Sequence, residues 1–223
     1  MLKCCTLFRR KPGTTVDEYQ AYWRTGHVPF IKAMAPVRKY VQNHPFAVGG
    51  RAPAYDGLVE LWVDDIERLK AMGASPEYAA VVEDEKNFVD RSTIELTLAD
   101  EHVVLDGAAT PDAVKQVILL KRKPGMTPAE FQNYWLNRHA PLVGRPPGLI
   151  RYVQSHARLS GYRDGREPPW DGIGTMLFAS LEAMQQARTA PGQDAVKADA
   201  VNFADMDRLV SFLTREHVMI AGR

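Results

Sequence analysis

Hydrophobic and polar residues follow two periodicities along this chain, one helical and one strand-like. Residues 19–23 and 131–135 each place aromatic side chains at i, i+3 and i+4, which predicts two amphipathic helices with an aromatic stripe. A threonine followed three residues later by a glutamate precedes each stripe, at Thr15 and Thr127. This capping-box pattern predicts that both helices begin there.

The remaining segments predict strands around a second helix. Each first helix should end near a histidine, because the proline two residues later disfavours helical geometry in the residue before it. For the first half we expect strands at 2–8, 37–44, 58–63 and 93–98, and the second helix within 75–90. The order β-α-β-β-α-β is typical of a ferredoxin-like sandwich, an antiparallel sheet with both helices on one face.

The whole pattern occurs twice. Arg10-Lys11-Pro12-Gly13 recurs 112 residues later as Arg122-Lys123-Pro124-Gly125, and further motifs follow in register. These are Tyr22-Trp23, His27-x-Pro29 and Tyr40-Val41-Gln42-x-His44 at that offset, then Asp56-Gly57, Asn87-Phe88 and Glu101-His102-Val103 after a three-residue insertion in the second copy. We therefore expect a first repeat at 1–105, a linker at 106–113 and a second repeat at 114–223.

A ferredoxin-like sheet leaves one face bare, and two copies in one chain can cover it by packing those faces together. The predicted fold class is thus α+β, with tandem ferredoxin-like repeats that form an intrachain dimeric α+β barrel.

The repeated motifs resemble those of the EthD family, over nearly the whole chain. The resemblance rests on Lys-Pro-Gly, the helix ending Tyr-Trp-x-x-x-His-x-Pro, the strand Tyr-Val-Gln-x-His, Asp-Gly and the final Glu-His-Val. It implies the dimeric α+β barrel superfamily, whose relatives include polyketide cyclases, anthrone decarboxylases, muconolactone isomerases, cofactor-free monooxygenases and some haem-handling enzymes. The resemblance is specific for fold and not for reaction, because one fold hosts many chemistries.

Composition narrows the classes of partner. With 28 Lys+Arg against 27 Asp+Glu, the net charge of +1 gives no field that would attract nucleic acid or a membrane surface. The two cysteines are adjacent, so a disulfide between them would be strained, and no long apolar segment or leader pattern occurs. We expect a cytoplasmic protein. No metal-binding, P-loop or dinucleotide motif is present, so we expect no cofactor, with haem as an alternative.

The alternation of side chains between the two faces of a strand predicts which residues form the site. Tyr40, Gln42 and His44 share one face of their strand, and we expect that face to line the barrel while Val41 meets the helices. In the next strand Glu60 and Trp62 should also face the interior. His44 beside Glu60 would be an acid-base pair, assisted by Tyr40 or His27. The alternative is a pair of hydrogen-bonded core residues.

The second copy differs inside: Thr175 replaces Glu60, and Phe212 replaces Thr97. We hypothesise that the first repeat carries the chemistry and the second a hydrophobic wall. The expected substrate-binding residues are Gln42, Trp62, Tyr152, Gln154, His156, His139, Thr175 and Phe212.

The sequence is compatible with three functions. The first is a cofactor-independent enzyme that performs a lyase-type elimination, decarboxylation or dehydration on a small apolar, aromatic substrate. The second is a cofactor-free or haem-dependent monooxygenase. The third is a non-catalytic protein that binds a hydrophobic metabolite in a degradation pathway. A homodimer is compatible with each.

Overall fold

The computed structural model describes residues 1–222. The first repeat contains β1 (Leu2–Arg10), α1 (Val16–Thr25), α2 (Val28–Ala33), β2 (Lys39–Pro45), β3 (Gly57–Val63), α3 (Ile66–Gly73), α4 (Pro76–Glu85) and β4 (Val89–Leu105). The second contains β5 (Val114–Leu120), α5 (Pro128–Tyr134), the π-helical turn η1 (Trp135–His139), α6 (Ala140–Val143), β6 (Leu149–Ala157), the 3-10 segment η2 (Leu159–Gly165), β7 (Gly172–Phe178), α7 (Leu181–Arg188), α8 (Gln193–Ala200), the 3-10 turn η3 (Met206–Arg208) and β8 (Val210–Ile220).

The chain divides into two compact units. Unit 1 is Met1–Ala99 with the segment that starts at Glu216, and unit 2 is Asp100–Arg215, so β4 and β8 each run through both units. The strand order is β4-β1-β3-β2-β8 in unit 1 and β8-β5-β7-β6-β4 in unit 2, in one antiparallel sheet. The predicted fold class, tandem ferredoxin-like repeats in one chain, is confirmed.

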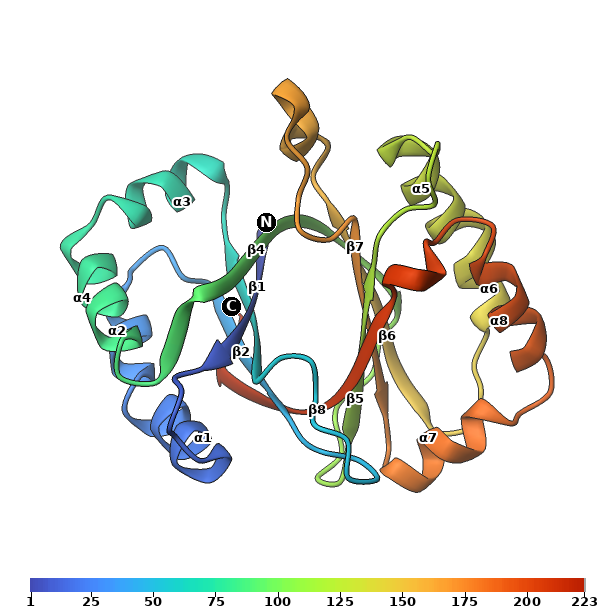
Figure 1. The fold of residues 1–223 in the computed structure, drawn as a ribbon, viewed down its shortest axis with the longest axis horizontal. Coiled ribbons are helices and arrows are strands. Elements are labelled where there is room, and N and C mark those ends of the chain that lie inside the picture. The colour runs from blue at the N-terminus through green and yellow to red at the C-terminus, as the bar shows by residue number, and fades with distance from the viewer. Residues whose placement is uncertain (223) are drawn as a thin grey trace. The chain divides into compact units, whose positions relative to one another are not determined.

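Helices cover one face of the sheet in each unit, as Figure 1 shows for α1–α4 over the strands of unit 1. The predicted capping boxes are present: the side chains of Thr15 and Glu18, and of Thr127 and Glu130, each bond the backbone N–H of the other residue. Two helices of the first repeat are absent from the sequence prediction. They are α2, which directly follows α1, and α3, which begins after the N-cap Asp65 and directly precedes α4. The predicted second helix is α4, which lies within residues 75–90 as expected.

Strand register decides which side chains face the helices, because directly paired residues of neighbouring strands point to the same face. Tyr40 pairs with Leu61 and Gln42 with Val59, and these positions of β3 pack against the helices. The expectation that Tyr40, Gln42 and His44 face away from the helices is therefore wrong.

Hydrogen bonds to α1 explain why polar side chains are accepted under the helices. Gln42 Nε2 donates to the Trp23 carbonyl at 2.8 Å, and Trp23 Nε1 donates to the Tyr40 hydroxyl at 3.0 Å. His44 stacks on the Trp23 ring at 4.6 Å, and its Nε2 lies 3.0 Å from Gln42 Oε1. These contacts satisfy the Gln42 amide, the Trp23 indole N–H and His44 Nε2, and the buried network fixes α1 on β2.

The opposite face of the unit 1 sheet carries a buried ion pair. Lys3 Nζ lies 2.7 Å from Glu60 Oε1, and Asn43 Nδ2 donates to Glu60 Oε2 at 3.0 Å. The ammonium groups of Lys3 and Lys39 lie over the Trp62 ring, 4.7 and 4.5 Å from its centroid. Glu60 and Trp62 do face away from the helices, but the predicted pairing of His44 with Glu60 is wrong because the two lie on opposite faces.

The second repeat follows the same register. Tyr152 pairs with Met176, Gln154 with Gly174, and His156 with Gly172, which puts these three on the helix side, and the prediction that they face away is wrong too. Thr175 and Phe212 lie on the opposite face, since both pair with Val117. His156 stacks on Trp135 at 4.8 Å as His44 does on Trp23.

Glu60→Gln should destabilise the protein by about 3 kcal/mol, because it removes the carboxylate that lies 2.7 Å from the buried Lys3 ammonium. Urea unfolding at pH 7 measures the change, and Glu67→Gln is the matched control because it breaks an exposed Lys–Glu pair. A Glu60→Gln variant as stable as the control would contradict this role.

Acid should destabilise the fold through His44 and His156. Burial, His217 and Arg24 lower the pKa of His44 to about 3, and burial and His102 lower the pKa of His156 to about 3. Below the unfolded pKa of about 6.5 only the unfolded chain takes up these protons, so each histidine removes about 1 kcal/mol of unfolding free energy per pH unit down to its folded pKa. Urea unfolding at pH 7 and pH 5 tests this. His44→Gln should flatten the slope, and an unchanged slope would exclude His44 as its source.

Candidate active site

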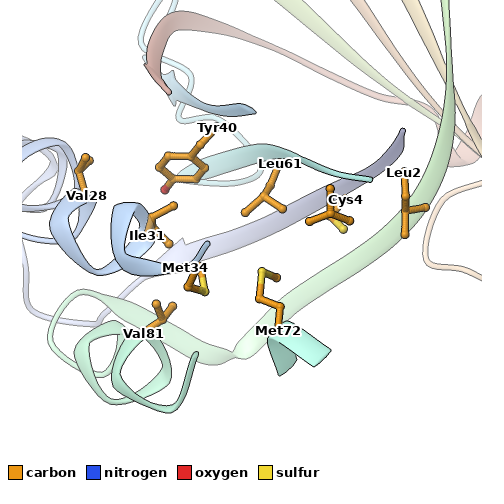
Figure 2. Close-up of a cluster of buried hydrophobic side chains, with 10 residues drawn as sticks. Leu2, Cys4, Val28, Ile31, Met34, Tyr40, Leu61, Met72 and Val81 are labelled. Atoms are coloured by element: carbon orange, nitrogen blue, oxygen red, sulfur yellow. The ribbon is translucent and has the colours of Figure 1, made fainter. Parts of the chain in front are cut away.

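A cavity of about 310 Å³ lies within unit 1, between its sheet and its helices. Figure 2 shows how its wall is built: Tyr40, Leu61 and Cys4 point from the strands toward Ile31, Met34, Met72 and Val81 of the helical layer. Most other lining residues are apolar too, among them Trp23, Phe88 and Ile94. The cavity therefore suits the apolar body of a small molecule.

His27 contributes an imidazole to this wall. It is the residue before α2 and is only 3% exposed. Its Nδ1 lies 2.7 Å from Asp84 Oδ2, and Tyr22 donates its hydroxyl to Asp84 Oδ1 at 2.5 Å. Asn87 Nδ2 adds a longer contact to the same oxygen at 3.4 Å. Asp84 thus has the donors that a buried carboxylate needs, and it fixes the ring of His27.

This arrangement leaves His27 ready to accept a proton. A carboxylate on Nδ1 favours the tautomer with the proton on Nδ1, so Nε2 carries the lone pair in the cavity wall. Burial lowers the pKa of His27 below its ordinary value, and the hydrogen bond and charge of Asp84 oppose part of that effect. At neutral pH the imidazole is uncharged and can act as a base.

Tyr40 also lines this cavity. Its oxygen accepts hydrogen bonds from Trp23 Nε1 at 3.0 Å and from Gln42 Nε2 at 3.3 Å. With these two acceptor positions used, the hydroxyl proton is free to point elsewhere. Burial raises the pKa of Tyr40 to about 12, so the phenol stays protonated and can donate. Tyr40 can therefore stabilise negative charge on an oxygen in the cavity.

Unit 2 repeats the histidine and its acidic partner. His139 Nδ1 lies 2.9 Å from Asp199 Oδ2, and Tyr134 donates to Asp199 Oδ1 at 2.7 Å. The surroundings differ, because the Trp135 ring lies directly against β7, where a Cβ added to Gly172 would be 2.4 Å from it. The two histidines nevertheless share the same local hydrogen bonds.

Two of the four predicted catalytic residues, His27 and Tyr40, come together around one cavity. Gln42 and His44 support Tyr40 and Trp23 and are not among the lining residues, and Glu60 lies on the other face. The other predicted binding residues, Trp62 in unit 1 and Tyr152, Gln154, His156, His139, Thr175 and Phe212 elsewhere in the chain, do not line this cavity either.

Sequence reasoning missed Asp84. It lies 57 positions after His27, so no local spacing connects the two residues. A signal did exist: Asp84-x-x-Asn87-Phe88 recurs as Asp199-x-x-Asn202-Phe203. The aspartate therefore belongs to the repeated pattern, with the Asn-Phe pair that was recognised.

Residues 1–222 contain no group of three or more His, Cys, Asp or Glu side chains arranged to hold a metal ion. Within the same range, every helix is too short or too polar to cross a bilayer.

Comparison with solved structures places the fold among known proteins. An anthrone oxidase-like protein matches with a TM-score of 0.69 and 14% identity, covering 98% of this chain and 93% of its own. A proposed monooxygenase from Lactobacillus acidophilus matches with a TM-score of 0.60 and 12% identity, covering 99% and 96%. An ethyl tert-butyl ether degradation (EthD) family protein from Bacillus halodurans is 26% identical over 47% of this chain and 99% of its own, with a TM-score of 0.39.

None of the curated proteins compared matches the chain. The family model for the EthD domain matches twice, at residues 11–92 and 123–207, one match in each repeat. These two segments make up more than half of the sequence and contain both His–Asp pairs. The chain belongs to the EthD family, with two EthD domains in tandem.

Proposed function

We propose that this chain is an enzyme that removes a proton from a small, mostly apolar, aromatic substrate bound in the cavity of unit 1. The observation that carries the proposal is the hydrogen bond of His27 Nδ1 to Asp84 in the wall of an otherwise apolar cavity. An uncharged imidazole oriented by a carboxylate and shielded from water is the arrangement of a general base.

Each residue has one role in the proposed step. Nε2 of His27 accepts the proton, and Asp84 stabilises the imidazolium that forms. The negative charge left on the substrate moves to a conjugated oxygen, and the Tyr40 hydroxyl donates a hydrogen bond to that oxygen. The step needs only these side chains and the electron sink of the substrate, so we propose that it proceeds without a cofactor.

Dioxygen is the proposed co-reactant. The enolate passes one electron to dioxygen, and the two radicals combine to a peroxide on the same carbon. His27 returns its proton to the peroxide and gives a hydroperoxide. The remaining C–H bond on that carbon and the O–O bond then break and release water, so that a CH2 group and O2 become C=O and H2O. An oxidase-like protein and a proposed monooxygenase of the same fold support this choice over the lyase-type reaction, which would consume no oxygen.

We also predict the location and the partners of the enzyme. We expect a cytoplasmic enzyme whose partner is its small substrate, with a homodimer compatible with the fold.

His27→Asn should lower kcat/KM for anthrone by at least about 100-fold, because it removes the general base. Oxygen uptake with anthrone as the probe measures this, and anthraquinone should form in equal amount. The matched control is His139→Asn in unit 2, which should leave the rate unchanged.

Equal loss in both variants, or none in His27→Asn, would overturn the role of His27. Anthrone that binds wild type without turnover would favour the non-catalytic binding protein. Product formed without oxygen uptake would favour the lyase-type reaction. Active protein should be colourless, and a haem absorption band would contradict cofactor independence.

The pH profile should reflect the lowered pKa of His27. We expect kcat/KM to rise with pH through an apparent pKa below about 6.5 and to be level above it, because only the uncharged imidazole accepts the proton. Asp84→Asn should lower the plateau, since an amide no longer enforces the tautomer with the proton on Nδ1. A kcat/KM that rises only above about pH 6.5 would rule out His27 as the titrating base.

A further inference from the structure

Two charged side chains stand at the cavity of unit 1, although the rest of its lining is uncharged or apolar. Glu85 is the last residue of α4, and Arg91 lies near the start of β4. Their side chains are 22% and 36% exposed, and Arg91 Nη1 donates to Glu85 Oε2. The pair is therefore at the rim, where the cavity meets water.

The second repeat shows that the fold does not require this pair. The equivalent residues in unit 2 are Ala200 and Met206, both uncharged. The neighbouring motif residues are the same in both repeats. An aspartate directly precedes Glu85 and Ala200, and an Asn-Phe pair begins two positions after each of them. A partly exposed ion pair also contributes little stability. The chemistry of a ligand gives a better reason for charges at this rim.

Arg91 has unused capacity for hydrogen bonds. Within residues 1–222 its side chain bonds Glu85 through Nη1, and that contact holds the guanidinium beside the cavity. A guanidinium has five N–H donors in a planar fork that matches a carboxylate. A second anion can therefore bind to the remaining donors while Glu85 keeps the side chain in place.

We propose that Arg91 recognises a carboxylate on the substrate, and that Glu85 positions Arg91 for this. The substrate class is then an aromatic carboxylic acid whose apolar rings occupy the cavity and whose carboxylate stays at the rim. This proposal rests on the proposed function, because it assigns the substrate class of the same site.

Calorimetric titration of the full-length protein with anthracene-2-carboxylate and anthracene-2-carboxamide tests the assignment. The two probes have the same rings and differ in charge. Wild type should bind the carboxylate about tenfold more tightly, as one charge-assisted hydrogen-bonded contact predicts. Arg91→Met, which installs the residue found in unit 2, should remove this preference and leave carboxamide affinity unchanged.

Arg91→Lys should keep part of the preference, because a lysine retains the charge and loses the fork. Arg68→Met is the control, since Arg68 is exposed in unit 1 and is not among the lining residues. Equal affinity of wild type for the two probes, no binding of either, or a preference that survives Arg91→Met would overturn the proposal. A preference for the carboxylate in wild-type protein that takes up no oxygen with anthrone would refute the proposed reaction and keep the role of Arg91.

Discussion

The antiparallel pairing of β2 with β3 determines which side chains of these strands can reach the helices and the site beneath them. Because Tyr40 lies opposite Leu61 and Gln42 opposite Val59, both polar side chains point under the helices. There they meet the C-terminal part of α1, and the Trp23 carbonyl and indole N–H satisfy them. A shift of one residue would place them on the other face and leave Trp23 without these partners.

The same register separates two kinds of buried polar chemistry. On the face away from the helices, the charges of Lys3 and Glu60 lie 2.7 Å apart, and Asn43 donates a hydrogen bond to the other Glu60 oxygen. Beneath the helices, His27 is bonded through one ring nitrogen, and Tyr40 accepts hydrogen bonds without an assigned acceptor for its own proton. These two residues, each with hydrogen-bonding capacity left for a ligand, line the cavity, so we assign the chemistry there.

The sequence predicted the repeats, the capping boxes and the element order, because these depend on local motifs and on their recurrence. It failed on the direction of Tyr40, Gln42 and His44. Alternation divides a strand into two faces but does not say which one the helices cover, and Val41 appeared to be the better core residue. In the structure the helices cover the face that carries Gln42, whose side chain donates a hydrogen bond to the Trp23 carbonyl. The Asp84 partner of His27 depends on the packing of α4 beside α2, which no local pattern encodes.

The proposed reaction requires that His27 is an uncharged base with its lone pair on Nε2. Nitrogen NMR of 15N-histidine-labelled protein at pH 7.5 tests this directly, with His27→Asn to assign the signals. We predict a protonated Nδ1 and an unprotonated Nε2 for His27, because Asp84 accepts a hydrogen bond from Nδ1. A His27 ring protonated on Nε2 alone, or on both nitrogens, would contradict it.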